Sequence, residues 1–267
     1  MLSRTLTIIV SIPLILLLTY FGGIFFLLLV LGLALFSINE FYFLMGKKRL
    51  HPSYVIGNII TVVFILFANY TIKNPAWEPY AAGILTTGAI LALCSGIFVK
   101  KTEGVMDDIG ITILGIVYIG WFFSYFVLLR SITLHGAYLY FLLFTVWAED
   151  ITAYLVGRFF GRTPLLPNIS PKKTVEGAIA GFIVCLIAAE IFGYFNSFNL
   201  IHTLILGMII GVIAPVSDLV ESMIKRDAGA KDSGDILPGH GGILDRMDSF
   251  ILSAPILYYY LTWFVLR

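Results

Sequence analysis

The sequence predicts an all-α polytopic membrane protein with about nine transmembrane helices. Apolar residues make up 59% of its 267 positions and charged residues only 12%, about half the charged share of a typical soluble domain. The apolar residues also fall into runs of about 17–25, the length of helix that crosses roughly 30 Å of hydrocarbon. A chain with so few polar side chains needs lipid around it, and helices satisfy their own backbone groups there.

The apolar runs place the predicted helices along the chain. The first run lacks a small-residue cleavage site, so we expect it to be retained as a helix rather than removed as a leader. Gly22 and Gly23 then form a tight turn before the second run. The nine predicted spans are 5–21, 24–45, 53–72, 80–99, 109–129, 134–156, 174–195, 200–221 and 247–266.

The chain divides into a plain first half and a charged second half. We expect residues 1–133 to form a scaffold of membrane helices, and residues 134–267 to carry the chemistry on the cytoplasmic side. Cys94 and Cys185 both lie inside apolar runs, so they predict packing residues rather than a disulfide. Nothing in the charge distribution favours a nucleic acid as partner.

The distribution of basic residues predicts the orientation. With a cytoplasmic N-terminus, only Lys73, Arg130 and Arg267 of the 17 Lys and Arg residues lie outside. The positive-inside rule favours this arrangement, which places the C-terminus on the outer side. The two largest polar loops, 157–173 and 222–246, then both face the cytoplasm.

Four aspartates lie near the cytoplasmic ends of the predicted spans: Asp150, Asp218, Asp245 and Asp248. Carboxylates in a membrane helix are costly and usually mark a cavity, an ion site or a proton relay. Their common depth favours a cation site over the alternative, in which each acid pairs with a nearby base to hold helices together. Oxygen ligands of this kind suit Mg²⁺.

One of these acids belongs to a polar helix face. Asp218, Glu221, Ser222 and Lys225 follow the spacing i, i+3, i+4 and i+7, so they line one side of a helix. The cysteines and the four histidines are too scattered for a zinc pattern.

The second large loop predicts a polyanion site. Lys225, Arg226, Lys231 and Arg246 surround a glycine-rich stretch around His240, Gly241 and Gly242. Glycine lets the backbone approach phosphate oxygens closely. The stretch is neither a Walker A loop nor a dinucleotide fingerprint, and taken alone it could also be a hinge.

The first large loop carries a second basic cluster. Ala153, Gly157 and Gly161 recur every four residues, which permits close helix contact. We expect Ser170 to cap the next helix, with Pro171 at its first position. Lys172 and Lys173 would then lie in a first turn that attracts anions, which predicts a bound phosphate. The alternative is ordinary anchoring by positive charge.

Taken together, these segments resemble a known family, the phosphatidate cytidylyltransferases or CDP-diacylglycerol synthases. The resemblance lies in Ser222-x-x-Lys225-Arg226, Lys231-Asp232, Pro238-x-His240-Gly241-Gly242 and Asp245-Arg246-x-Asp248. The segment from Ser170 to Gly177 is similar to a second cytoplasmic block of the same family. The first 130 residues add little beyond hydropathy.

The resemblance implies that CTP and phosphatidic acid react to give CDP-diacylglycerol and pyrophosphate. A phosphatidate oxygen would attack the CTP α-phosphorus in line, at the inner surface of a bacterial cytoplasmic (inner) membrane. One or two Mg²⁺ ions would assist, membrane lipids would surround the protein, and a homo-oligomer is left open.

The resemblance also implies a role for each motif residue. The catalytic set is Asp218, Asp245, Asp248, Lys225 and Arg246. The Mg²⁺ ligands would be Asp218, Asp245, Asp248 and Asp150. The substrate-binding set is Ser222, Arg226, Lys231, Asp232, His240, Gly241, Gly242, Lys172, Lys173 and Thr174.

Two other functions stay open. A CTP-dependent lipid-alcohol kinase would transfer the γ-phosphate instead, and an ion-coupled transporter also places acids inside spans. A transporter should hold them near the midplane, whereas here they gather at one end. A CDP-alcohol phosphotransferase is disfavoured because its D-x-x-D-G-x-x-A-R core is absent. Glu190, near the outer face, is expected to be a helix-packing or oligomer contact.

Overall fold

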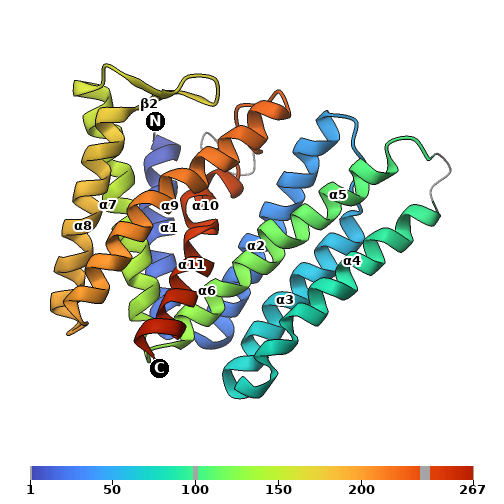
Figure 1. Ribbon diagram of the computed structural model, residues 1–267, viewed down its shortest axis with the longest axis horizontal. Coiled ribbons are helices and arrows are strands. Elements are labelled where there is room, and N and C mark those ends of the chain that lie inside the picture. Colours follow the sequence, from blue (N-terminus) through green and yellow to red (C-terminus); the bar gives the residue numbers. More distant parts are fainter. Residues whose placement is uncertain (1, 99–101, 235–240, 267) are drawn as a thin grey trace. The chain divides into compact units, whose positions relative to one another are not determined.

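The computed structural model describes residues 2–98, 102–234 and 241–266. Helices occupy all nine places where the apolar runs predict them (Figure 1). The first six of these places hold α1 (Leu2–Phe21), α2 (Gly23–Lys47), α3 (Tyr54–Lys73), η1 (Pro75–Tyr80) with α4 (Ala81–Ile97), α5 (Val105–Gly115) with η2 (Ile116–Trp121) and α6 (Phe122–Ser131), and α7 (Ala137–Phe160). The last three hold α8 (Val175–Phe195), α9 (Leu200–Asp227), and the divided helix α10 (Leu244–Ile251), α11 (Ser253–Tyr260) and η3 (Leu261–Val265).

The helical membrane class is therefore confirmed. Within the described residues, seven helical stretches are long and apolar enough to cross a membrane: 23–47, 54–73, 75–97, 105–131, 137–160, 175–195 and 200–227. The total of nine spans and the orientation stay predictions.

The chain forms two compact units. One contains residues 1–136 and 227–246, and the other contains residues 137–226 and 247–267. The division falls inside α10, after Arg246. Each unit has its own packing and its own group of predicted functional residues.

The core of the first unit is built around Tyr42 on α2. Its ring is completely buried, and its hydroxyl donates to the Thr112 carbonyl oxygen at 2.9 Å. Gly57 on α3 and Gly115 on α5 face this ring, and a Cβ at either position would collide with it. The absence of side chains at Gly57 and Gly115 therefore leaves the space that the Tyr42 ring fills.

In the same unit, Arg130 caps the C-terminal end of α1. Its guanidinium donates to the carbonyl oxygens of Thr19, at 2.5 Å, and Tyr20, at 3.0 Å. These carbonyls end a helix and lack partners within it, and a cation there also complements the helix dipole.

In the second unit, α7 and α8 run side by side (Figure 1). Small residues allow this approach, because a Cβ on Gly177 would lie 2.6 Å from the Ala153 carbonyl oxygen and 3.2 Å from the Gly157 Cα. The predicted close contact through Ala153 and Gly157 is confirmed.

The connection between α7 and α8 corrects one prediction. Ser170 does not cap a helix; it begins strand β2 (Ser170–Thr174), which pairs antiparallel with β1 (Pro164–Leu166). Lys172 and Lys173 therefore lie on a strand rather than in a helical first turn. Thr174 is the cap instead, and its hydroxyl accepts from the Gly177 amide at 3.2 Å.

The physical reason lies in the charges of the two candidate first turns. Starting at Pro171 would place Lys172 and Lys173 against the positive end of the helix dipole. Starting at Val175 places Glu176 there instead, with a favourable sign. The Glu176 carboxylate also accepts from the backbone amides of Arg162 and Thr163, each at 3.1 Å, which ties the end of α7 to the start of α8.

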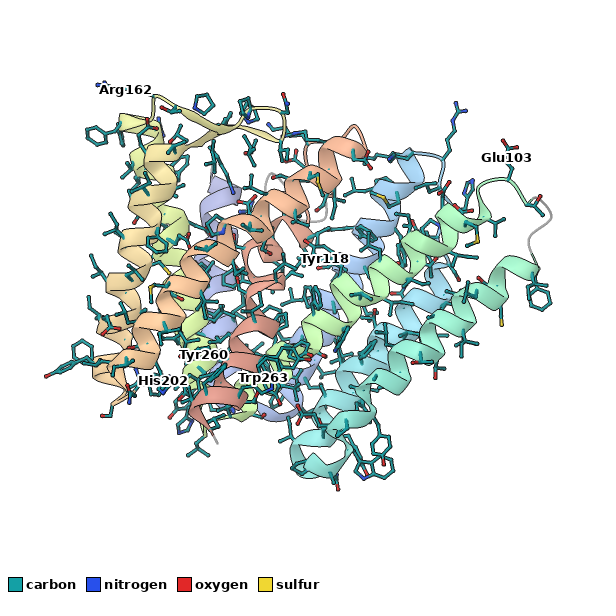
Figure 2. All side chains as sticks on the ribbon, in the orientation of Figure 1. Glu103, Tyr118, Arg162, His202, Tyr260 and Trp263 are labelled. Atoms are coloured by element: carbon teal, nitrogen blue, oxygen red, sulfur yellow. The ribbon has the colours of Figure 1, made fainter. Side chains whose placement is uncertain are left out.

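Two polar contacts near the start of α9 join this helix to α8 and α11. Thr203 donates to Glu190 Oε1 at 2.8 Å, so Glu190 is a helix-packing contact, as one of the two alternatives predicted. The His202 ring lies beside Tyr260, with Nδ1 2.9 Å from the hydroxyl (Figure 2).

Candidate active site

Three of the four predicted ligand acids meet in the second unit. Asp150 comes from α7, Asp218 from α9 and Asp248 from α10, and each acts electrostatically on the others. Asp150 is exposed, and Asp218 and Asp248 are half-buried. The cluster can therefore be reached from outside the protein.

Asp218 is held by two neighbours. Lys173 on β2 places its Nζ 2.6 Å from Oδ2, and Ser222 donates to Oδ1 at 3.2 Å, one turn further along α9. The hairpin that replaces the expected helix start thus delivers a lysine to the acid cluster. Lys173, predicted to bind substrate phosphate, pairs here with an acid.

The predicted polar face of α9 is confirmed by two bonds along it. Besides the Ser222–Asp218 bond, Lys225 pairs with Glu221 at 2.6 Å. Both side chains are buried, with Glu221 wholly inaccessible. Lys225 also acts electrostatically on Asp248, so the second lysine of the cluster is shared between two acids.

Ser217 fixes the backbone that carries Asp248. Its hydroxyl donates to the Asp248 carbonyl oxygen and accepts from the Leu252 amide at 3.2 Å. Asp248 and Leu252 are four residues apart, so a regular helix would join these two groups directly. The inserted hydroxyl takes the place of that bond, and this insertion separates α10 from α11.

Asp150 has a weaker tie to α10. Ser249 Oγ lies 3.4 Å from Asp150 Oδ1, while the Ser249 amide donates to Asp248 Oδ1 at 2.7 Å. One serine therefore contacts both acids. Glu149, which precedes Asp150, is buried and packs against Gly181 on α8.

The first unit holds the glycine-rich part of the predicted site. Asp245 Oδ2 accepts from the Gly242 amide at 2.8 Å, and from the Ser233 amide and hydroxyl at 2.9 Å each. Gly241 has a φ of +77°, which favours glycine. Asp245, predicted as a metal ligand, therefore also organises this loop.

Glu40 on α2 is a functional candidate that the sequence reasoning missed. It is 4% exposed. Its Oε1 accepts from the Ile243 amide at 2.9 Å, and its Oε2 accepts from the Leu244 amide at 2.8 Å and lies 2.9 Å from Ser233 Oγ. One signal could have found it: Glu40 is the first acidic residue of the chain and lies inside an apolar run.

The other predicted residues are mostly at the surface. Arg226 donates from Nε to the Ile169 carbonyl oxygen at 3.2 Å, which ties α9 to the hairpin. His240 lies outside the described residues. The exposed positions are Lys172, Arg226, Lys231, Asp232 and Arg246.

The acid cluster of the second unit brings four carboxyl side chains close to two lysines. Asp150, Asp218, Asp248 and Glu221 interact with the two lysines Lys173 and Lys225. Such a group of oxygen donors suits a hard divalent cation. Among residues 2–98, 102–234 and 241–266, no three acidic, histidine or cysteine side chains stand in the arrangement of a formed metal site. The Mg²⁺ assignment stays a prediction.

Comparison with known proteins gives a consistent result. Residues 2–264 match the model of a cytidylyltransferase family. The chain is 33% identical over 269 residues to the phosphatidate cytidylyltransferase of Bacillus subtilis, covering 98% of both chains. It is 32% identical to the enzyme of that name from Synechocystis, covering 97% of this chain and 95% of the other. The Staphylococcus haemolyticus enzyme of that name is 34% identical, with 95% and 96% covered.

Proposed function

Because the chain belongs to the cytidylyltransferase family, we propose that it transfers the cytidylyl group of CTP to phosphatidic acid. The products are CDP-diacylglycerol and pyrophosphate. One structural observation supports this most directly. Two sequence blocks that resemble the family lie far apart in the chain: Lys173 in the first pairs with Asp218 at 2.6 Å, and Ser222, which begins the second, donates to the same carboxylate at 3.2 Å.

The reaction needs positioning and charge compensation more than covalent help from the protein. An oxygen of the phosphatidate attacks the α-phosphorus of CTP, and the bond from that phosphorus to the β-phosphate bridging oxygen breaks. Because the phosphatidate is already an anion, no strong general base is required. Lys225 and Arg246 are the bases proposed to offset the negative charge of the two substrates.

The acid cluster supplies the residues that would hold Mg²⁺. Asp150, Asp218 and Asp248 fit such a role because they bring three carboxyl groups together. Asp245, which lies in the first unit, is the fourth ligand that we propose from the sequence. Bound Mg²⁺ would act as a Lewis acid that neutralises charge on the phosphates.

We further propose that the site faces the cytoplasm from a bacterial inner membrane. The positive-inside distribution of Lys and Arg supports this orientation. Phosphatidic acid would then present its headgroup at the same surface that CTP reaches from solution. This arrangement needs no path for CTP across the hydrocarbon.

The test is an assay of the purified full chain in detergent with labelled CTP, phosphatidic acid and Mg²⁺. We expect a cytidylyl lipid and pyrophosphate in equal amounts, and no product when phosphatidic acid is omitted. Release of CDP together with a phosphorylated lipid alcohol would establish the kinase alternative. CTP left intact with every lipid acceptor would overturn the proposal.

A further inference from the structure

Glu40 is a buried carboxylate that the proposed mechanism does not use. It lies on α2, in the part of the chain expected to be a plain scaffold, and almost none of its surface is accessible. We propose that Glu40 is a positioning residue, which holds the start of α10 and residues 241–243 just before it in the conformation that the reaction needs. The kinetic part of this proposal rests on the proposed function.

The geometry is that of a helix cap supplied by another helix. The first amides of a helix have no partner within it, and a nearby side chain usually accepts from them. At α10 the acceptor is Glu40, which receives the amides of Ile243 and Leu244 on its two oxygens at 2.9 and 2.8 Å. A carboxylate at this end of a helix also complements the dipole.

Ser233 carries the effect of Glu40 to Asp245. The Ser233 hydroxyl lies 2.9 Å from Glu40 Oε2 and 2.9 Å from Asp245 Oδ2. Asp245 lies in the first turn of α10 and is one of the proposed ligands. Glu40 therefore fixes both the backbone of that turn and the serine that orients the Asp245 side chain.

The contact leaves no space for adjustment. Gly242 lies against both partners, and a Cβ there would collide with Ser233 Oγ and Glu40 Oε2. Gly234 is also close, with a built Cβ 3.1 Å from Glu40 Oε1. Because Glu40 is enclosed in this way, its loss would leave buried amides without acceptors, which is costly.

The first experiment measures hydrogen–deuterium exchange in the full chain and needs no activity. In Glu40→Gln, one acceptor oxygen becomes an amide NH₂, which cannot accept a hydrogen bond, so the Ile243 amide or the Leu244 amide loses its acceptor. We expect amide exchange in residues 241–251 to rise about tenfold or more, as the loss of one charge-assisted bond predicts, with α3 unchanged. Exchange equal to that of the wild-type chain would overturn the proposal.

Ser37→Ala is the matched control. Ser37 lies one turn before Glu40 on α2, is fully buried, and its hydroxyl has no hydrogen-bond partner in the described part of the chain. We expect its exchange and turnover to equal those of the wild type. A rise in exchange at 241–251 in this variant equal to that in Glu40→Gln would show a general effect of altering α2, and would overturn the proposal.

The second experiment measures turnover. Displacement of a reacting group by about 1 Å can cost about 100-fold in rate, so we expect kcat of Glu40→Gln to fall about 10- to 100-fold with the KM for CTP nearly unchanged. Ser233→Ala removes the bridge from the loop side and leaves α2 intact, so it tests the same link if Glu40→Gln does not fold. We expect both effects in this variant as well.

The two measurements separate the failure of this proposal from that of the proposed function. Faster exchange with normal kcat would show that Glu40 holds the loop but does not position the reaction, which overturns the positioning role. If Glu40→Gln exchanges faster but the wild-type chain itself forms no cytidylyl lipid, the structural link is confirmed and the assigned reaction is refuted.

Discussion

Asp218 shows how the individual side chains of the acid cluster limit one another. Its two oxygens are engaged by Lys173 and Ser222, and Asp150 and Asp248 add negative charge from adjacent helices. Negative charges on neighbouring carboxylates repel, so bases or a bound cation stabilise the arrangement. At the scale of residues, the cluster is therefore suited to binding a cation.

Replacing Asp248 by Asn tests this directly. Asn keeps the volume and can accept from the Ser249 amide, but it removes the negative charge. We expect kcat to fall at least about 100-fold, as loss of one preorganised electrostatic group typically does, with thermal unfolding in detergent unchanged. Near-normal turnover at saturating Mg²⁺ would contradict the ligand assignment.

Asp227→Asn is the control for Asp248→Asn. Asp227 is an exposed carboxylate that pairs with Lys48 at 2.5 Å, and such surface pairs contribute only about 0–1 kcal/mol. We expect turnover to equal that of the wild type.

Glu40 and Lys173 show what the sequence could predict of the site. The spacing of Asp218, Ser222 and Lys225 placed them correctly on one helix face, because helical periodicity is a local property. The Lys173–Asp218 pair depends on strand β2, and the sequence did not predict this strand because Ser170 followed by Pro171 is typical of a helix start. Glu40 is isolated in its apolar run, and its partners, at 233, 243 and 244, come from the other end of the chain.

Among the elements, the break between α10 and α11 connects sequence to site most closely. Ser217 is adjacent to Asp218 on α9, and its hydroxyl replaces the helical bond between Asp248 and Leu252. The helix that carries Asp248 is thus fixed to the helix that carries Asp218 through backbone groups. The hydropathy of 247–266 predicts a span there but not its interruption.

Ser217→Ala tests the role of this hydroxyl. The methyl group cannot bridge the two backbone groups, so either they bond directly and straighten the helix or they stay unpaired. We expect the free energy of unfolding to fall by about 1–3 kcal/mol. We also expect a lower kcat, measured on the same preparation. Ser253→Ala is the control: its hydroxyl donates to the carbonyl oxygen of Ser249, four residues earlier in the same divided helix, and we expect a smaller effect on both.

Close packing of α7 on α8 gives a second prediction at this scale. A Cβ at position 177 would press against the Ala153 carbonyl oxygen at 2.6 Å, so Gly177→Ala should cost about 1–3 kcal/mol, as overpacking usually does. Gly110→Ala places the same methyl on α5, where nothing lies within 4 Å, and should be neutral or stabilise by up to about 1 kcal/mol. Thermal unfolding of the two variants in one detergent compares them; equal stability would contradict the packing role.

For the whole molecule, the strongest prediction from sequence is the orientation in the membrane. Glu103 lies in a loop predicted to face the cytoplasm, and Leu134 lies at the predicted outer end of the span 134–156; both are exposed (Figure 2 labels Glu103). In a chain without Cys94 and Cys185, Leu134→Cys should react with a membrane-impermeant maleimide in intact spheroplasts. Glu103→Cys should react only after the membrane is opened. The reverse pattern would invert the topology.

Hydropathy predicted where the helices lie because the length and apolar character of each run are local properties of the sequence. It could not predict how the runs group. The first unit needs residues 227–246 as well as residues 1–136, and no local pattern around Glu40 indicates that its partners come so late. The hairpin between α7 and α8 was also missed, since five residues with two lysines carry too little hydrophobic periodicity to show a strand.

The contact between Glu40 and Ser233 also determines when, during synthesis, the first unit can complete its packing. The two residues are 193 positions apart, and a ribosome that adds about 5–20 residues per second needs roughly 10–40 s to make the second after the first. During that interval α2 is already made, but its carboxylate has none of its final partners. The first unit therefore completes its packing only when the chain is nearly finished, and a truncated chain that ends before residue 233 should leave this acid exposed to quality-control proteases.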